Sequence, residues 1–147
     1  MSPQSHIILL VEDCADDVFF MRYALKKAAI THPVHVVIDG EQTVDYLSGT
    51  GKYSDRDAFP LPTVVFLDLK LPLLSGFEVL AWIRSQPTVS HLPVFILSGS
   101  SEDRDREKAR ELGAKSYIVK PPREATLVQA MESLDSPLAL AGAPAES

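Results

Sequence analysis

Acidic side chains follow two short apolar segments of the sequence. Residues 7–11 lead into Glu12 and Asp13, and residues 63–67 lead into Asp68. An apolar run of this length is typical of a buried parallel strand. Because the carboxyl ends of parallel strands meet at one edge of an open α/β sheet, where such sheets bind ligands, we expect the three carboxylates to lie close together there.

Two further apolar runs place a hydroxyl and an amine at the same edge. Residues 93–97 lead into Ser98, and residues 115–119 lead into Lys120. A carboxylate such as that of Asp68 can attack phosphorus and form an acyl phosphate. An ammonium group and a hydroxyl group can then bind the phosphoryl oxygens. The pattern therefore indicates a site for a phosphoryl group with Asp68 as the nucleophile.

The same acidic residues match the ligands that Mg²⁺ prefers, which are hard oxygen atoms from one or two carboxylates, waters and phosphate. Asp13 and Asp68 can supply the carboxylates, and Glu12 can act directly or through a water molecule. Crowded carboxylates repel one another, so their pKa values should rise without a cation and fall when one binds. The sequence therefore predicts a divalent-cation site beside the nucleophile.

The apolar runs alternate with segments of helical periodicity. Val18, Met21 and Leu25 recur at the spacing of a buried helical stripe, and Gly113 is a typical helix stop. The expected strands are 7–11, 34–38, 63–67, 93–97 and 115–119. The expected helices are 15–29, 41–48, 75–86, 102–112 and 124–134. Five such units predict an α/β fold with a parallel sheet, right-handed crossovers and helices on both faces.

Length and composition limit the classes of protein. A chain of 147 residues is one domain of ordinary size, and the net charge of −6 argues against nucleic acid as a partner. No apolar run approaches the ~20 residues of a spanning helix, and the N-terminus lacks the basic region of a signal peptide. With a single cysteine, these features predict a cytoplasmic protein without membrane contacts. The four histidines lack metal-ligand spacing, so we expect surface or edge positions for His6, His32, His35 and His91.

Four motifs at the strand ends resemble the receiver domains of two-component response regulators. They are Val-Glu-Asp at 11–13, Leu-Asp-Leu-Lys-Leu-Pro at 67–72 followed by Gly76, Leu-Ser-Gly at 97–99, and Tyr-Ile-Val-Lys-Pro at 117–121. The resemblance covers residues 6–134. It implies a flavodoxin-like sheet of order 2-1-3-4-5. It also implies a receiver domain over 1–134, followed by an alanine- and proline-rich tail over 135–147.

The resemblance assigns a role to each motif residue. It implies that the bound metal is Mg²⁺ or Mn²⁺ and that the lysine–proline bond at 120–121 is cis. The roles are phosphoacceptor for Asp68, metal ligands for Asp13, Asp68 and the backbone carbonyl of Lys70, phosphoryl contacts for Ser98 and Lys120, and a switching aromatic rotamer for Tyr117.

The resemblance also implies partners. The phosphodonor would be a phosphohistidine of a sensor histidine kinase, and the output would pass through protein contacts because the chain shows no output domain. The Val-Glu-Asp start, the Ala15-Asp16-Asp17 helix start and the long loop 49–62 are similar to stand-alone regulators paired with bacterial phytochrome kinases. Members of that subfamily are often dimeric, so we expect a homodimer. Beyond its own phosphorylation and dephosphorylation, such a protein is not an enzyme.

Three alternatives remain at this stage. A phosphorelay intermediate would pass the phosphoryl group on to a histidine phosphotransfer protein. A phosphatase of the haloacid dehalogenase type needs an acid–base aspartate two residues after the nucleophile, where this chain has Lys70. A flavodoxin relative needs a phosphate-binding loop after the first strand, but residues 12–17 are mostly acidic and would repel phosphate.

Overall fold

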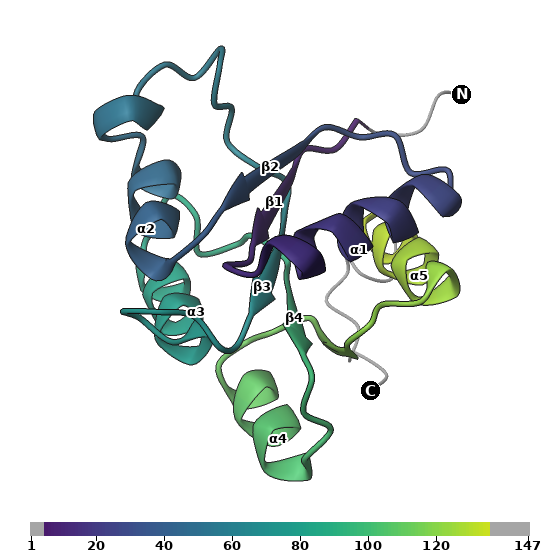
Figure 1. The fold of residues 1–147 in the computed structure, drawn as a ribbon. Coiled ribbons are helices and arrows are strands. Elements are labelled where there is room, and N and C mark those ends of the chain that lie inside the picture. Colours follow the sequence, from purple (N-terminus) through teal and green to yellow (C-terminus); the bar gives the residue numbers. More distant parts are fainter. Residues whose placement is uncertain (1–4, 136–147) are drawn as a thin grey trace.

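The computed structural model describes residues 5–135 and contains one sheet of five parallel strands in the order β2-β1-β3-β4-β5 (Figure 1). The strand order and the α/β class predicted from the resemblance are confirmed. The three central strands β1, β3 and β4 are short and fully buried, as expected for strands covered on both faces, whereas the edge strands β2 and β5 are only partly buried. The strands are β1 (Ile8–Val11), β2 (Val34–Val37), β3 (Val64–Asp68), β4 (Val94–Ser98) and β5 (Ser116–Val119).

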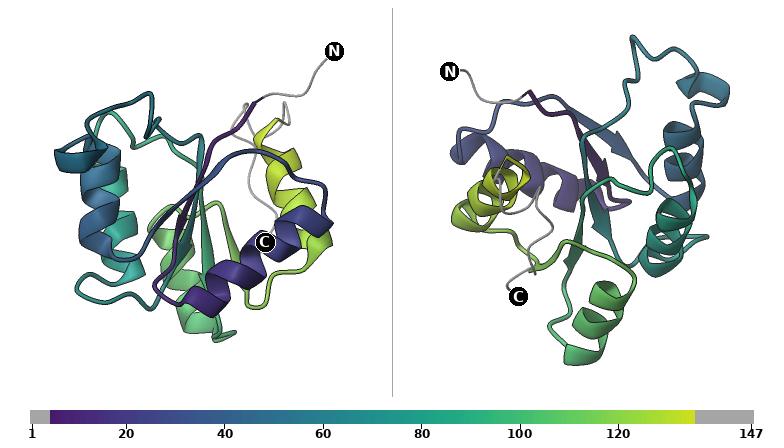
Figure 2. Two further views of the ribbon diagram at one scale, coloured as in Figure 1. Left: turned by 45° about the horizontal axis from the view of Figure 1, so that its top comes forward. Right: turned by 180° about the vertical axis from the view of Figure 1, so that it is seen from behind.

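Helices cover both faces of the sheet (Figure 2). On one face α1 (Ala15–Lys27) contacts α5 (Glu124–Leu134), and on the other α2 (Gly40–Ser48) contacts α3 (Gly76–Ser85). The short helix α4 (Asp103–Glu111) lies beside β5 and buries only Ala109, because all of its other residues are charged. The helices begin and end within about two residues of the predicted bounds, the ordinary uncertainty of helix ends.

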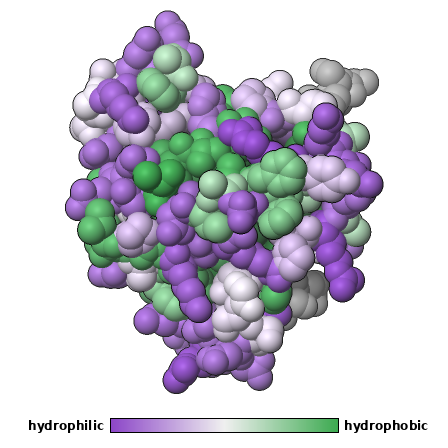
Figure 3. Space-filling model, viewed as in Figure 1, coloured by the Kyte–Doolittle hydropathy of each residue, from purple (hydrophilic) through white to green (hydrophobic). Residues whose placement is uncertain are grey.

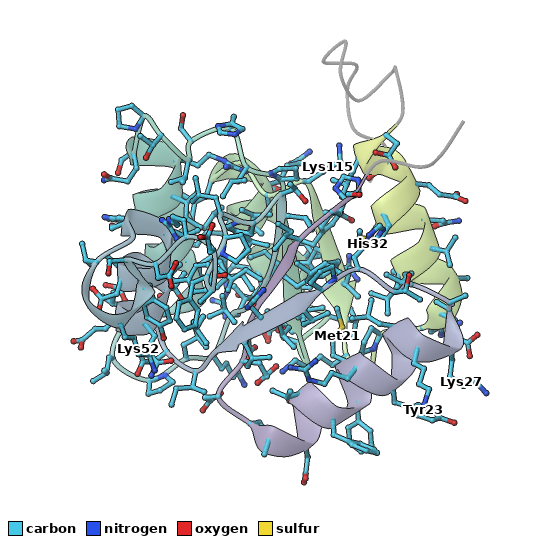
Figure 4. All side chains as sticks on the ribbon, turned by 90° about the horizontal axis from the view of Figure 1, so that it is seen from above. Met21, Tyr23, Lys27, His32, Lys52 and Lys115 are labelled. Atoms are coloured by element: carbon cyan, nitrogen blue, oxygen red, sulfur yellow. The ribbon has the colours of Figure 1, made fainter. Side chains whose placement is uncertain are left out.

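The two faces of the sheet bury separate apolar layers because alternate residues of a strand point to opposite sides. Ile8 and Leu10 of β1 pack towards α1 and α5, whereas Leu9 and Val11 pack towards α2 and α3. On α1, Met21 points towards the interior, while Tyr23 and Lys27 point outwards (Figure 4). These two layers pack against opposite faces of the sheet and together position its carboxyl edge.

The pairing register brings the strand ends level with one another. Val11 pairs with Leu67, and Asp68 pairs with Leu97. Ser98 in turn pairs with Val119, directly before Lys120. The side chains of Glu12, Asp68, Ser98 and Lys120, which are expected to do chemistry, therefore lie along one edge of the sheet.

The loop 49–62 contains structure that the sequence did not predict. A 3-10 turn spans Gly51–Tyr53, and the rings of Tyr46, Tyr53 and Phe59 pack together with centroids 5.0 to 6.1 Å apart. The Arg56 guanidinium donates hydrogen bonds to the carbonyls of Tyr46, Leu47 and Phe59, which closes the end of α2. This loop is therefore a compact extension of α2.

The surface or edge position expected for His6 is wrong. The His6 side chain is buried, with Nδ1 2.9 Å from Thr63 Oγ1 and Nε2 2.9 Å from Asp135 Oδ1. Its ring also packs edge-on against His32 at 5.3 Å. These partners are remote in the sequence, so only the packing of β1 beside α5 reveals them. The expected tail lies outside the described residues apart from Asp135. Within residues 5–135, no helix has the length and apolar character needed to cross a membrane.

Candidate functional site

The acidic residues at the carboxyl edge form one cluster, as the sequence predicts. One carboxylate oxygen from each of Glu12, Asp13 and Asp68 lies within 4.8 Å of the others. Glu12 and Asp68 are buried, with exposures of 1% and 5%, whereas Asp13 is exposed. The cluster thus has a closed inner side and one carboxylate open to solvent.

Lys120 reaches into this cluster from the end of β5. Its Nζ lies 2.7 Å from Glu12 Oε1, 2.8 Å from Asp17 Oδ2 and 3.3 Å from Asp68 Oδ2. The first and third contacts follow from the predicted edge. The second was not predicted, because Asp17 lies on the first turn of α1 and precedes Lys120 by 103 residues. Its position four residues after Asp13, at the start of the helix that follows β1, is the sequence signal that could have pointed towards the site.

The backbone after β3 shapes the surroundings of Asp68. The Lys70 N–H donates to Asp68 Oδ1 at 3.2 Å and so orients the carboxylate. A Cβ at Gly76 would collide with the Asp68 carbonyl and the Leu69 Cα, so only glycine lets α3 start this close to β3. Ser75 and Glu78 then form a reciprocal capping box that starts α3. Gly76 of the motif is therefore required by the fold beside the nucleophile.

Ser98 and Tyr117 are connected through Ser100. The Ser100 N–H donates to Ser98 Oγ at 3.0 Å, and the Tyr117 hydroxyl donates to the Ser100 carbonyl at 2.8 Å. Ser98 is fully buried, while Tyr117 is half-buried with the Arg106 guanidinium 4.9 Å from its ring centre. A displacement of Ser98 or of the loop behind it would therefore reach the Tyr117 side chain.

Burial dominates the electrostatics of the cluster. Burial raises the pKa of Glu12 from 4.5 to about 7, Asp68 adds to this rise, and Lys120 opposes it. For Lys120, burial acts to lower the pKa, but the hydrogen-bonded carboxylates of Asp17 and Glu12 and the charge of Asp68 raise it. The lysine is thus a fixed cation among carboxylates, and burial makes Glu12 hold its proton to a higher pH than an ordinary glutamate.

The donor set fits a hard divalent cation. Three carboxylates that converge on one point, one of them open to solvent, match the oxygen ligands and retained waters of Mg²⁺ or Mn²⁺. The raised pKa of Glu12 shows that its negative charge is poorly compensated, and a cation would remove that deficit. The residues present are therefore suited to hold such a metal.

A cavity of about 270 Å³ opens beside the cluster, between α1 and the loop after β5. Glu12, Asp17 and Lys120 line its polar side, and Phe20 and Pro121 line its apolar side. The bond between Lys120 and Pro121 is cis, as the resemblance implies. The cavity gives water access to the outer side of the Lys120 ammonium.

Comparisons with known proteins agree with this geometry. A family model for the response regulator receiver domain matches residues 8–132. Response regulator Rcp1 of Synechocystis sp. is 32% identical over 139 residues, which cover 92% of this chain and 92% of Rcp1. The structure of bacteriophytochrome response regulator RtBRR matches with a TM-score of 0.80 and 38% identity, covering 90% of this chain and 80% of that chain. The predicted similarity to phytochrome-associated regulators is thereby confirmed.

Two further similar structures are of response regulators in defined chemical states, one bound to Mn²⁺ and one phosphorylated. The Mn²⁺-bound form of Rcp1 has a TM-score of 0.72 and 30% identity, covering 86% of this chain and 90% of that chain. The phosphorylated cyanobacterial phytochrome response regulator RcpA has a TM-score of 0.74 and 33% identity, covering 98% of this chain and 100% of that chain. With the family match, the carboxyl-edge cluster and the sheet order, these similarities show that the chain belongs to the response regulator receiver family of two-component systems.

Proposed function

We propose that Asp68 accepts a phosphoryl group from a phosphohistidine of a sensor histidine kinase. The observation that carries the proposal is the buried Asp68 carboxylate at the end of β3, with the Lys120 ammonium 3.3 Å away. A carboxylate oxygen of Asp68 attacks phosphorus and forms an acyl phosphate as the P–N bond breaks. The leaving imidazole takes a proton from water. Lys120 and Ser98 bind the phosphoryl oxygens and offset their charge.

Asp13 and Asp68 would hold Mg²⁺ or Mn²⁺ together with the Lys70 backbone carbonyl, and Glu12 would bind directly or through water. When bound, the metal neutralises charge on the phosphoryl oxygens. The proposal is supported by the convergent carboxylates of Glu12, Asp13 and Asp68, and by the Mn²⁺-bound form of the similar Rcp1.

Phosphorylation would change the surface through Ser98 and Tyr117. The phosphoryl group adds about two negative charges and strong acceptor oxygens. Ser98 would turn towards them, and the Ser100 segment would move with it because the Ser100 N–H is bonded to Ser98 Oγ. Tyr117 would then lose its present acceptor and change rotamer. The surface formed by α4, β5 and α5 would carry the signal to a partner protein.

The kinase in this proposal is of the phytochrome type, and the two proteins meet in the cytoplasm. Its support is the similarity to RtBRR, a bacteriophytochrome response regulator, and to RcpA, a cyanobacterial phytochrome response regulator. The same similarity supports a homodimer and a receiver domain over residues 1–134.

The experiment that tests the proposal is intact-protein mass spectrometry with the small phosphodonor acetyl phosphate. Wild type should gain one phosphoryl group in the presence of Mg²⁺ and none with EDTA. Asp68→Asn should gain none. Asp57→Asn, which neutralises an exposed aspartate of the loop 49–62, is the matched control and should behave as wild type. Phosphorylation of Asp68→Asn at the wild-type rate would show that another residue is the acceptor.

A further inference from the structure

Three carboxylates surround the Lys120 ammonium, which donates a hydrogen bond to Asp17. An ammonium group carries three N–H bonds, and Nζ has three carboxylate neighbours, at 2.7 Å in Glu12, 2.8 Å in Asp17 and 3.3 Å in Asp68. The side chain is only 18% exposed, so water replaces few of these contacts. A phosphoryl group that arrives on Asp68 therefore competes with Glu12 and Asp17 for the ammonium.

The three carboxylates differ in what their displacement would cost. The Glu12 side chain is 2% exposed and would be left buried without its cationic partner. Asp68 is itself the acceptor and stays beside its own phosphoryl group. The Asp17 side chain is 35% exposed and lines the cavity, so water can solvate its carboxylate after release. Asp17 is therefore the partner that Lys120 gives up most easily.

We propose that Asp17 is a positioning residue that holds Lys120 on the α1 side of the site until the phosphoryl group arrives and then releases it. This inference rests on the proposed phosphorylation of Asp68. Asp17 does not touch the reacting atoms in this arrangement. It acts through Lys120 by stabilising the unphosphorylated arrangement of the cluster.

Release of Lys120 by Asp17 affects the rate of phosphorylation but not the rate at which the acyl phosphate is hydrolysed. On the way to phosphorylation, Lys120 exchanges Asp17 for a phosphoryl oxygen, so the ion pair adds to the barrier. During hydrolysis of the acyl phosphate, Lys120 is already with the phosphoryl group in both the starting state and the transition state. Loss of the Asp17 carboxylate should therefore speed phosphorylation without changing the rate of decay. A partly exposed ion pair corresponds to a change of up to about fivefold in rate.

Asp16 provides a matched control. Asp16 and Asp17 are neighbours in the first turn of α1, where both interact with the positive end of the helix dipole. Asp16 is exposed and makes no ion pair with any residue in the described part of the chain. Asp16→Asn therefore removes the same charge from the same turn without freeing Lys120. Asp17→Glu restores a carboxylate that can still reach the ammonium.

The experiment measures phosphorylation by acetyl phosphate and decay after removal of the donor in wild type, Asp17→Asn, Asp16→Asn and Asp17→Glu, all at saturating Mg²⁺. In the transfer, the bond between phosphorus and the acetate oxygen breaks as the bond to Asp68 forms, and acetate leaves. We expect Asp17→Asn alone to be phosphorylated faster, by about two- to fivefold, with the decay rate of wild type. Asp17→Glu should return to the wild-type rate.

Other outcomes overturn the inference. Slower phosphorylation of Asp17→Asn would show that Asp17 orients Lys120 for the transfer. A rate equal to that of wild type would show that the ion pair between Asp17 and Lys120 does not limit phosphorylation. An equal acceleration in Asp16→Asn would show that the effect comes from the loss of one negative charge in this turn and not from the ion pair. In each case Asp68→Asn still reports separately on the acceptor, because phosphorylation that survives in Asp68→Asn contradicts the proposed function itself.

Discussion

Binding of Mg²⁺ should depend on pH through Glu12. Burial raises the pKa of this carboxyl to about 7, with Asp68 adding to the rise and Lys120 opposing it. The charged groups that face it are Lys120 from β5, Asp68 from β3, and Asp13, next in sequence. A metal ion binds the ionised carboxylate, so a proton must leave Glu12 when the cation enters. Affinity for Mg²⁺ should therefore rise with pH.

The magnitude follows from the pKa. With a pKa of about 7, Glu12 is roughly nine-tenths protonated at pH 6 and one-tenth protonated at pH 8. The fraction of protein ready to bind metal thus changes about tenfold between these pH values, or about 1.4 kcal/mol in binding free energy.

Isothermal titration calorimetry with MgCl₂ at pH 6 and pH 8 measures this difference. The measurement is repeated in two buffers of different ionisation enthalpy to count the protons released. Wild type should bind about tenfold more tightly at pH 8 and release part of a proton near pH 7. Glu12→Gln is the control and should bind with the same affinity at both pH values. Equal affinities in wild type, or an unchanged pH dependence in Glu12→Gln, would refute the assignment of the proton to Glu12.

Three further predictions concern the phosphoryl lifetime, the β3–α3 loop and the output surface. Lys70 is exposed two residues after Asp68 and can cover the phosphoryl group, so Lys70→Asn should lose phosphate up to about fivefold faster, measured at equal saturating Mg²⁺. Equal or slower decay would show that the lysine does not shield the bond. Leu73 has a φ of 72°, is 71% exposed and lies at the centre of a turn in which the Leu74 N–H donates to the Pro72 carbonyl. Glycine adopts a positive φ without strain, so Leu73→Gly should raise the free energy of unfolding by about 1 kcal/mol in urea denaturation. Lower stability would mean that the leucine makes contacts that outweigh the strain. Amide hydrogen exchange over residues 98–120 should change on full phosphorylation, and an unaltered pattern there would argue against α4 and β5 as the output surface.

The sequence by itself determined which residues stand at the carboxyl edge of the sheet. Apolar runs of strand length end in Glu12, Asp68, Ser98 and Lys120, and the geometry of parallel strands then requires these side chains to meet. This inference needs only the position of each residue relative to its own strand. The resemblance to receiver domains added the strand order and the cis bond before Pro121, and both agree with the structure.

Only the tertiary structure decided which groups pair and which are buried. The contact between Asp17 and Lys120 depends on how α1 packs beside the loop after β5, across 103 residues of sequence. The pKa of Glu12 depends on its burial, and the interior position of His6 depends on Thr63 and Asp135. Periodicity describes how one segment meets its immediate surroundings, whereas desolvation and ion pairing depend on atoms from several segments at once. For that reason the edge of the site is readable from the sequence, while its charge balance and the role proposed for Asp17 come from the fold.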